Sequence, residues 1–420
     1  MICDRVMYGS LLALIVFLPY SLAMISAFEV IISLTWLAKR WISQKWEFKP
    51  NSMTWPLIAL GLLILLTIPW SHFPSLSFKK FSSRFLFQIL LMGVVMEVIS
   101  SRKRLYVVLG VLLFTVFFTC VDALGQYAWA HYHDQGQSPL LFGRVSGPMH
   151  HPNDFGTLLV TVLPVVLILM INCRRWLPFG MAFLVLIGTL GLTSSRGAWV
   201  AFAVSMMALG LIVRRRNVII PIFLMLVMFF WGFGMYCLGT RIDIYSVSMQ
   251  HGPHIRPSFG NPWGLPEQYN PWALLSSSSG RELYWDTAIN VIKTSPVFGC
   301  GYSAYLKTLN DMQISGTEYP HNSILHITAE LGILGLIFYL WLFGALCQQA
   351  WKILQKVSAD KDLYVLGCGL CCGILAWMIH SLVDTPWSSL QLSILVWLLI
   401  GILLSLENKG VLAGTQKGRL

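Results

Sequence analysis

Long apolar segments recur along the whole chain, separated by short polar connections. A helix that crosses a bilayer needs about 20 apolar residues. We therefore predict about twelve transmembrane helices, the first two of them short and separated near Pro19. They lie near residues 9–20, 22–38, 54–70, 84–99, 105–127, 154–172, 177–194, 197–213, 218–238, 323–348, 363–383 and 388–406.

The composition excludes a soluble globular protein. Hydrophobic residues make up 56% of the chain, charged residues only 11%, and the mean hydropathy is +0.67. Soluble domains carry about 25% charged residues. The fold class expected is an all-α polytopic membrane protein.

The basic residues indicate how the chain lies in the membrane. With a cytoplasmic N-terminus, 19 of the 29 Lys and Arg residues fall in cytoplasmic connections and tails. This excess is the pattern of the positive-inside rule, and it predicts cytoplasmic N- and C-termini. The distribution argues against nucleic acid as the reason for the net charge of +11.

One connection is far longer than the others. We divide the chain into a bundle of about nine spans (1–238), an outer loop region (239–322) and a three-span part with a cytoplasmic tail (323–420). Plain connections rarely exceed about 15 residues. The Pro- and Gly-rich stretch 251–280 predicts irregular structure at the start of this loop region.

A short amphipathic helix is predicted later in the loop region. Ser279-Gly280-Arg281-Glu282 has the spacing of a capping box. The apolar face expected for the helix consists of Trp285, Ala288, Ile289 and Ile292.

Two arginines on the outer side are candidates for binding an anion. Arg196 begins the eighth span in LTSSRGAWVAF, where Ser194 or Ser195 could cap the helix. A helix N-terminus beside a guanidinium suits an anion; alternatively, the side chain snorkels to the headgroups. Arg281 could bind phosphate in a bidentate manner, or form a surface pair with Glu282 or Asp286.

His321 precedes the tenth span on the same side as both arginines, with Asn322 beside it. An imidazole with an ordinary pKa near 6.5 suits proton transfer at neutral pH. The alternative is a structural interfacial histidine. Glu330 lies on another face of the predicted helix, too deep to orient His321, and could pair with His326.

The outer loop that ends at Asn153 is shaped by Gly and Pro, and Arg144 and Asn153 within it could contact a ligand. The loop could equally be purely structural. Its adjacent histidines, His150 and His151, have no third ligand nearby, so no metal site is expected.

The remaining polar groups of the apolar segments have structural explanations. They are an i,i+4 pair of His380 and Asp384, bundle contacts of Asp122 and Glu29, a cytoplasmic Asp360-Lys361-Asp362 motif, and packing thiols at Cys368 and Cys371.

Four segments together resemble the O-antigen ligase/polymerase superfamily of bacterial envelope proteins. They are GRVSGPMHHPNDFG, TSSRGAW, GRELYWDTAINVIKTSPVFGCGYSAY and HNSILHITAELGILG, within residues 140–345. The resemblance implies a GT-C-like glycosyltransferase of the bacterial inner membrane that needs no cofactor or metal. Its active site would face the periplasm, with Arg196, Arg281 and His321 as catalytic residues and Arg144, Asn153 and Asn322 as further substrate-binding residues.

The twelve spans and the long loop resemble the ligase branch best. Its members transfer O-antigen from undecaprenyl diphosphate to lipid A–core among membrane lipids. The first 130 and last 70 residues match only in hydropathy, so an O-antigen polymerase is a second interpretation. A transporter or flippase for the same glycan is a third, although we find no repeated halves of the kind many transporters have.

Overall fold

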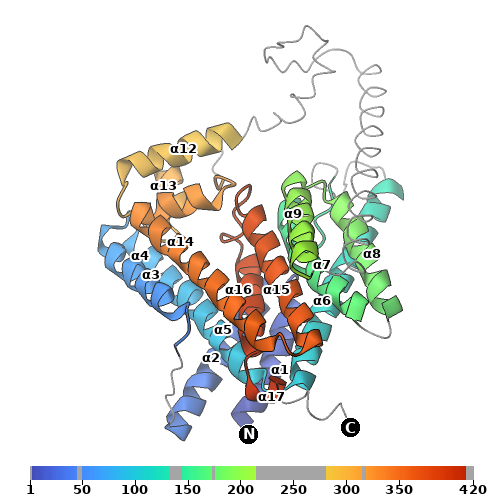
Figure 1. The fold of residues 1–420 in the computed structure, drawn as a ribbon. Coiled ribbons are helices and arrows are strands. Elements are labelled where there is room, and N and C mark those ends of the chain that lie inside the picture. The colour runs from blue at the N-terminus through green and yellow to red at the C-terminus, as the bar shows by residue number, and fades with distance from the viewer. Residues whose placement is uncertain are drawn as a thin grey trace, which may run out of the picture.

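The computed structural model describes residues 2–44, 50–132, 144–172, 176–213, 281–314 and 318–412. The predicted ninth span (218–238), the irregular stretch 251–280 and the capping residue Ser279 lie outside these ranges. The chain outside them is drawn as a thin grey trace (Figure 1).

The described structure is helical, which confirms the predicted fold class. Among the described residues, seven helices have the length and composition needed to cross a membrane, and three shorter helices are also apolar. The elements are α1 (Ile2–Phe17), α2 (Leu22–Ser43), α3 (Thr54–Thr67), η1 (Ile68–Trp70), α4 (Pro74–Lys80), η2 (Phe81–Leu86), α5 (Phe87–Val98), α6 (Arg102–Tyr132), α7 (Pro152–Asn172), α8 (Trp176–Leu192), α9 (Arg196–Val213), α12 (Arg281–Thr294), α13 (Tyr305–Asp311), α14 (Ser323–Val357), α15 (Lys361–His380), α16 (Leu390–Ser405) and α17 (Lys409–Leu412).

One predicted span begins earlier than expected. We predicted a helix from residue 84, but α4, η2 and α5 form one continuous helical segment from Pro74 to Val98. The polar residues between Pro74 and Arg84 hid its first turns from the hydropathy pattern. Arg84 therefore lies inside this segment, ten residues after its start, whereas the prediction placed it at the first residue of the helix.

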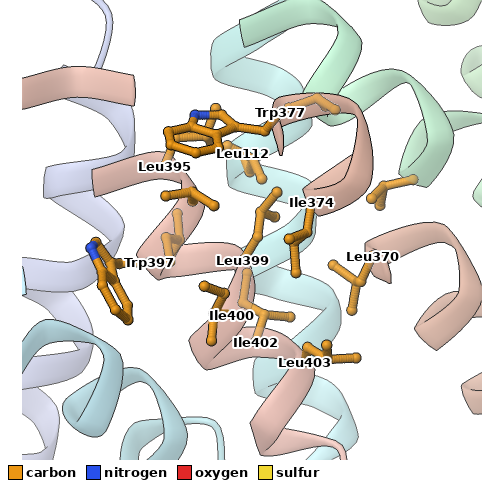
Figure 2. Close-up of a cluster of buried hydrophobic side chains, with 14 of the residues drawn as sticks. Leu112, Leu370, Ile374, Trp377, Leu395, Trp397, Leu399, Ile400, Ile402 and Leu403 are labelled. Atoms are coloured by element: carbon orange, nitrogen blue, oxygen red, sulfur yellow. The ribbon is translucent and has the colours of Figure 1, made fainter. Parts of the chain in front are cut away.

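Helices α7, α15 and α16 form the centre of the bundle. Every residue of α16 from Gln391 to Ser405 is buried, as expected of a helix that is apolar on all sides. Figure 2 shows its leucines and isoleucines packed against Leu370, Ile374 and Trp377 of α15 and Leu112 of α6. The indole Nε1 of Trp377 donates to the carbonyl of Leu392, 3.2 Å away, which ties the two helices together.

Glycines let the central helices approach each other closely. A side chain at Gly373 of α15 would meet the carbonyl oxygen of Thr161 of α7 at 2.3 Å. A side chain at Gly156 of α7 would meet Ala198 of α9 at 2.9 Å. Small residues at such contacts let backbones pack tightly within a membrane. Cys368 and Cys372 of α15 are buried free thiols in the same packed region.

Ion pairs join the helices at the end of the bundle where α1 begins and α17 lies (Figure 1). Glu97 pairs with both Lys39 and Arg40. Arg102 pairs with Asp360, whose carboxylate also caps α15 through the N–H groups of its first turn. The Asp360-Lys361-Asp362 motif is thus part of a helix cap and an ion pair.

Helix α14 is broken at Gly332, and the preceding loop fills the break. Gly332 has φ 67° and ψ −169°, a conformation found essentially only in glycine. The N–H groups of Cys300 and Gly301 donate to the carbonyls of Ala329 and Glu330, and the N–H of Ile333 donates to Pro296, all at 2.9 Å. The loop thereby satisfies backbone groups that the broken helix would leave unpaired inside a membrane.

Helices α12 and α13 lie at the opposite end of the bundle from α17 (Figure 1). Ala288 and Val291 of α12 are buried in a small core with Ala304 and Tyr305. The amphipathic helix was correctly predicted, but the residues predicted for its buried face were partly wrong. Trp285 and Ile289, predicted to face inward, are 37% and 38% exposed, whereas Thr287 and Val291 are buried.

We expect Gly332→Ala to destabilise the protein by at least about 2 kcal/mol, because the new Cβ would stand 2.0 Å from the carbonyl oxygen of Val297 in a strained conformation. Gly344→Ala is the matched control in α14, since nothing lies within 4 Å of its Cβ position. The thermal unfolding midpoint of the purified chain should fall only for Gly332→Ala. Equal midpoints for the two variants would contradict this explanation of the break.

Candidate active site

The start of α14 is attached to the segment that follows α15. Asn322 caps α14 by accepting from the N–H of Leu325, 3.0 Å away, and its side-chain amide donates to the carbonyl of Leu382 at 3.1 Å. The N–H of Ser323 donates to the carbonyl of Ser381 at 2.8 Å. Two interactions of Asn322 thus fix the residue before it, His321, against this segment.

His321 lies between two carboxylates. Its Nδ1 is 2.9 Å from Oδ1 of Asp384, and its Nε2 is 3.3 Å from Oε2 of Glu318. Asp384 is buried, and its Oδ1 also accepts from the N–H of Thr385 at 2.8 Å. Glu318 is largely exposed. The imidazole therefore has one nitrogen bound to a buried carboxylate and the other near the protein surface.

The charges of this pair shift both pKa values. Burial lowers the pKa of His321, but the hydrogen bond and charge of Asp384, together with Glu318, outweigh burial and raise it overall. Burial raises the pKa of Asp384, but the hydrogen bond with His321 and the charges of His380 and His321 keep it well below its ordinary value. The result is a basic imidazole beside a carboxylate that stays ionised.

Arg281 is close enough to act on this imidazole. It is the first residue of α12, and its positive charge opposes protonation of His321. Tyr284, one turn later, places its ring 5.8 Å from that of His321. Among the residues described, no carboxylate forms an ion pair with Arg281. The residue is half-buried.

The first turn of α9, which begins with Arg196, packs against the same segment. Ser195 Oγ lies 3.5 Å from Nε2 of His380, whose Nδ1 is 2.7 Å from Thr157 Oγ1 of α7. A side chain at Gly197 would meet Val383 at 2.6 Å. Arg196 therefore lies on a helical turn that packs against the residues between His380 and Asp384, and its side chain is exposed.

Arg144 and Asn153 bind each other. The guanidinium of Arg144 donates to Oδ1 of Asn153 at 2.7 Å and to the carbonyl of Thr193 at 2.8 Å. The N–H of Asn153 donates to Nδ1 of His151 at 3.1 Å. Burial lowers the pKa of His151, on which the charge of Asp384 also acts. This loop is thus fastened beside the candidate residues, and contact of Arg144 or Asn153 with a ligand stays a prediction.

One pairing and one bundle contact predicted from the sequence differ in the structure. His380 and Asp384 are not an i,i+4 pair, because α15 ends at His380 and the chain then turns. His380 instead contacts Thr157 and Ser195, and Asp384 contacts His321. Asp122, expected to contact the bundle, is exposed on α6, whereas Glu29 is buried as expected.

Glu330 has a structural role here. Its carboxylate accepts from the N–H groups of Ser303 and Tyr305, at 2.8 and 3.3 Å, and so holds the start of α13. The predicted i,i+4 pairing with His326 is present, because Nε2 of His326 lies 3.2 Å from Oε1 of Glu330, within ion-pair distance. In the described ranges, no group of three or more His, Cys, Asp or Glu side chains is arranged to hold a metal ion.

The raised pKa of His321 predicts a pH-dependent contribution to stability. Because the folded chain binds this proton more tightly than the unfolded chain, the contribution is complete below the ordinary pKa of 6.5 and is lost as the pH rises through the raised value. The difference in unfolding midpoint between the protein and His321→Gln should therefore shrink from about pH 5 to pH 8. A difference that stays constant over this range would contradict the assignment.

Comparison with known proteins covers part of these residues. Residues 181–340 match the model of a protein family described as O-antigen ligase. A protein of Rickettsia felis, provisionally named a polysaccharide ligase, is 30% identical over 149 residues, which are 33% of this chain and 34% of the relative. A protein of Rickettsia typhi with the same provisional name is 29% identical over 150 residues, 33% of this chain and 35% of the relative.

The matches thus span about a third of each curated relative. The family match includes Arg196, Arg281 and His321, whereas Asp384 lies beyond it in the sequence and is joined to His321 only by the fold. These matches support a relationship of the chain to the O-antigen ligase superfamily.

Proposed function

We propose that the protein is an inverting, metal-independent glycosyltransferase that transfers O-antigen polysaccharide from undecaprenyl diphosphate to lipid A–core. The observation that carries this proposal is the His321–Asp384 pair, with Arg281 beside it and the turn of Arg196 attached to the same segment. A base and two cations are the groups that such a displacement requires. The match to an O-antigen ligase family supports the reaction class.

His321 would act as the general base. With Nδ1–H donated to the Asp384 carboxylate, the lone pair of Nε2 is available to accept a proton. The acceptor hydroxyl would replace Glu318 at Nε2 and transfer its proton there as its oxygen attacks the anomeric carbon. A raised pKa brings the imidazole nearer to neutral pH, where a general base is most effective.

Arg281 and Arg196 would stabilise the leaving group. As the bond between the anomeric carbon and the diphosphate oxygen breaks, its electron pair stays on the diphosphate, which gains negative charge. Guanidinium groups and the N–H groups at the start of a helix such as α9 suit this charge. Preorganised donors of this kind contribute a few kcal/mol each to the transition state.

The reaction would take place at the periplasmic side of the inner membrane, with both termini in the cytoplasm. The excess of Lys and Arg in the predicted cytoplasmic connections supports this orientation. The candidate groups, near the start of α14, gather at the end of the bundle opposite α17 (Figure 1). A cluster at one face also favours an enzyme over a transporter, whose sites lie near mid-membrane.

The central test is the loss of transfer on substitution. His321→Ala should lower the rate by about 10²–10⁴-fold, and Arg281→Ala or Arg196→Ala by about 10²–10³-fold. Lys293→Ala, an exposed cation on α12, is the control for Arg281→Ala and should leave the rate unchanged. The readout is the lipopolysaccharide gel pattern of a deletion strain carrying each variant, with membrane insertion verified for each.

Normal O-antigen ladders from His321→Ala or Arg281→Ala would refute the assignment. The deletion strain itself separates ligase from polymerase: the ligase deletion leaves lipid A–core without O-antigen, whereas the polymerase deletion leaves a single attached repeat. Purified protein that joins donor to acceptor without an energy source would exclude a transporter.

A further inference from the structure

Glu318 places a second carboxylate at the imidazole of His321. Its Oε2 lies 3.3 Å from Nε2, the ring nitrogen that is not bound to Asp384. The side chain of Glu318 is 62% exposed, and among the described residues His321 is the one basic side chain within ion-pair distance of it. Exposed pairs of this kind add little to the stability of a fold. Stability alone therefore does not explain a carboxylate at this position.

The backbone on both sides of this contact is held in place. The ring of Tyr319, the residue after Glu318, meets the imidazole of His326 edge-on, with the ring centres 4.9 Å apart. Pro320 comes next and is buried, and its own ring fixes its φ. His321 has φ 47°, a left-handed conformation that residues other than glycine seldom adopt. Glu318 therefore precedes a firmly packed bend that brings its side chain beside the imidazole.

The protonation state of His321 decides what can lie between these two groups. With a proton on each nitrogen, the imidazole donates both to Asp384 and to Glu318. A general base has no proton on Nε2, so Nε2 and the Glu318 carboxylate are then both acceptors. Two acceptors side by side repel each other unless each receives a donor. The active form of His321 thus requires two O–H donors at neighbouring positions.

A sugar supplies two such donors when it carries hydroxyl groups on adjacent carbons. The oxygens of adjacent hydroxyls in a gauche arrangement are about one hydrogen-bond length apart. This spacing is close to the 3.3 Å between Nε2 of His321 and Oε2 of Glu318. One hydroxyl can therefore donate to each of the two atoms without a rearrangement of the backbone.

Tyr284 of α12 adds an aromatic ring beside the same two groups. Its ring centre lies 5.8 Å from that of His321, and the two ring planes are tilted by 54°. Burial and the charge of Glu318 raise the pKa of the Tyr284 hydroxyl, so the carboxylate acts on this ring as well. The negative face of an aromatic ring attracts the C–H groups of a sugar. An imidazole, a carboxylate and a phenol ring thus adjoin one small area of the surface.

We propose that Glu318 is a specificity-determining residue for the acceptor, and that the site selects a sugar with two vicinal hydroxyl groups. The first hydroxyl transfers its proton to Nε2 of His321 as its oxygen attacks. The second keeps its proton and donates a hydrogen bond to Glu318, while the sugar ring packs beside Tyr284. The inference deepens the proposed function by assigning a class of acceptor to this site, and in that respect it rests on the proposed function.

The test uses acceptors that differ by one hydroxyl. The full-length protein is purified in detergent and supplied with undecaprenyl-diphosphate-linked O-antigen and synthetic lipid A–core acceptors, in which each ring hydroxyl of the outer core sugars is replaced in turn by hydrogen. The analogue that lacks the attacking hydroxyl should not react. The analogue that lacks the adjacent hydroxyl should react with a kcat/KM lower by about 10–100-fold, the value of one hydrogen bond to a charged group.

Glu318→Ala completes the comparison. This variant should lower kcat/KM for the unmodified acceptor by the same factor, and the adjacent deoxy analogue should cause no further loss, because both changes remove the same hydrogen bond. Asp286→Ala, which removes an exposed carboxylate of α12, is the control and should discriminate between the acceptors as the unmodified protein does. If Glu318→Ala does not fold, Glu318→Gln keeps an acceptor oxygen without the charge and should retain only part of the discrimination.

The inference is overturned if the protein transfers O-antigen but reacts equally well with every adjacent deoxy analogue. It is also overturned if Glu318→Ala, or Glu318→Gln in its place, is as active as the unmodified protein, or if its loss adds to the loss caused by the analogue. These outcomes leave the proposed function standing, since the unmodified protein still transfers O-antigen to the unmodified acceptor. If it transfers none, the proposed function and this inference both fail.

Discussion

The candidate active site depends on a buried carboxylate. A carboxylate out of water is stable only if positive charge and hydrogen-bond donors surround it. Asp384 obtains these from His321, which shares a hydrogen bond with it, and from the N–H of Thr385. Because this requirement is strict, it determines where the start of α14 lies, and Asn322 and Ser323 fix that position with bonds to the same segment. The contacts that position the imidazole of His321 thus also keep the ionised carboxylate of Asp384 stable in its buried position.

The sequence predicted those features that depend on local pattern. The hydropathy pattern predicted twelve spans, and eleven of them are helices in the described part of the chain. Residue type and order along the chain indicated Arg196, Arg281 and His321 as candidate site residues. The position of Pro19 between the first two helices was also correct. These features arise within a few helical turns and need no knowledge of the fold.

Features that depend on contacts between distant segments could not be predicted. Asp384 is 63 residues from its partner His321, and the helical spacing wrongly assigned it to His380. The break in α14 was hidden because Gly332 is followed by further apolar residues that continue the helical pattern. Arg84 was overlooked since its π-helical turn is preceded by polar residues that resemble a loop. In each case the decisive partner comes from another helix.

The broken helix α14 has a consequence for how the chain between α12 and α14 can vary. Pro296, Cys300 and Gly301 complete the backbone hydrogen bonds of α14 with their main-chain atoms, so their spacing, more than their side chains, is constrained. A residue inserted between Pro296 and Gly301 would leave carbonyls of Ala329 and Glu330 unpaired in an apolar environment. Changes in loop length are therefore compatible with the fold only before α12 or after this anchor. The length of the chain can therefore vary in those stretches while the helical scaffold stays the same.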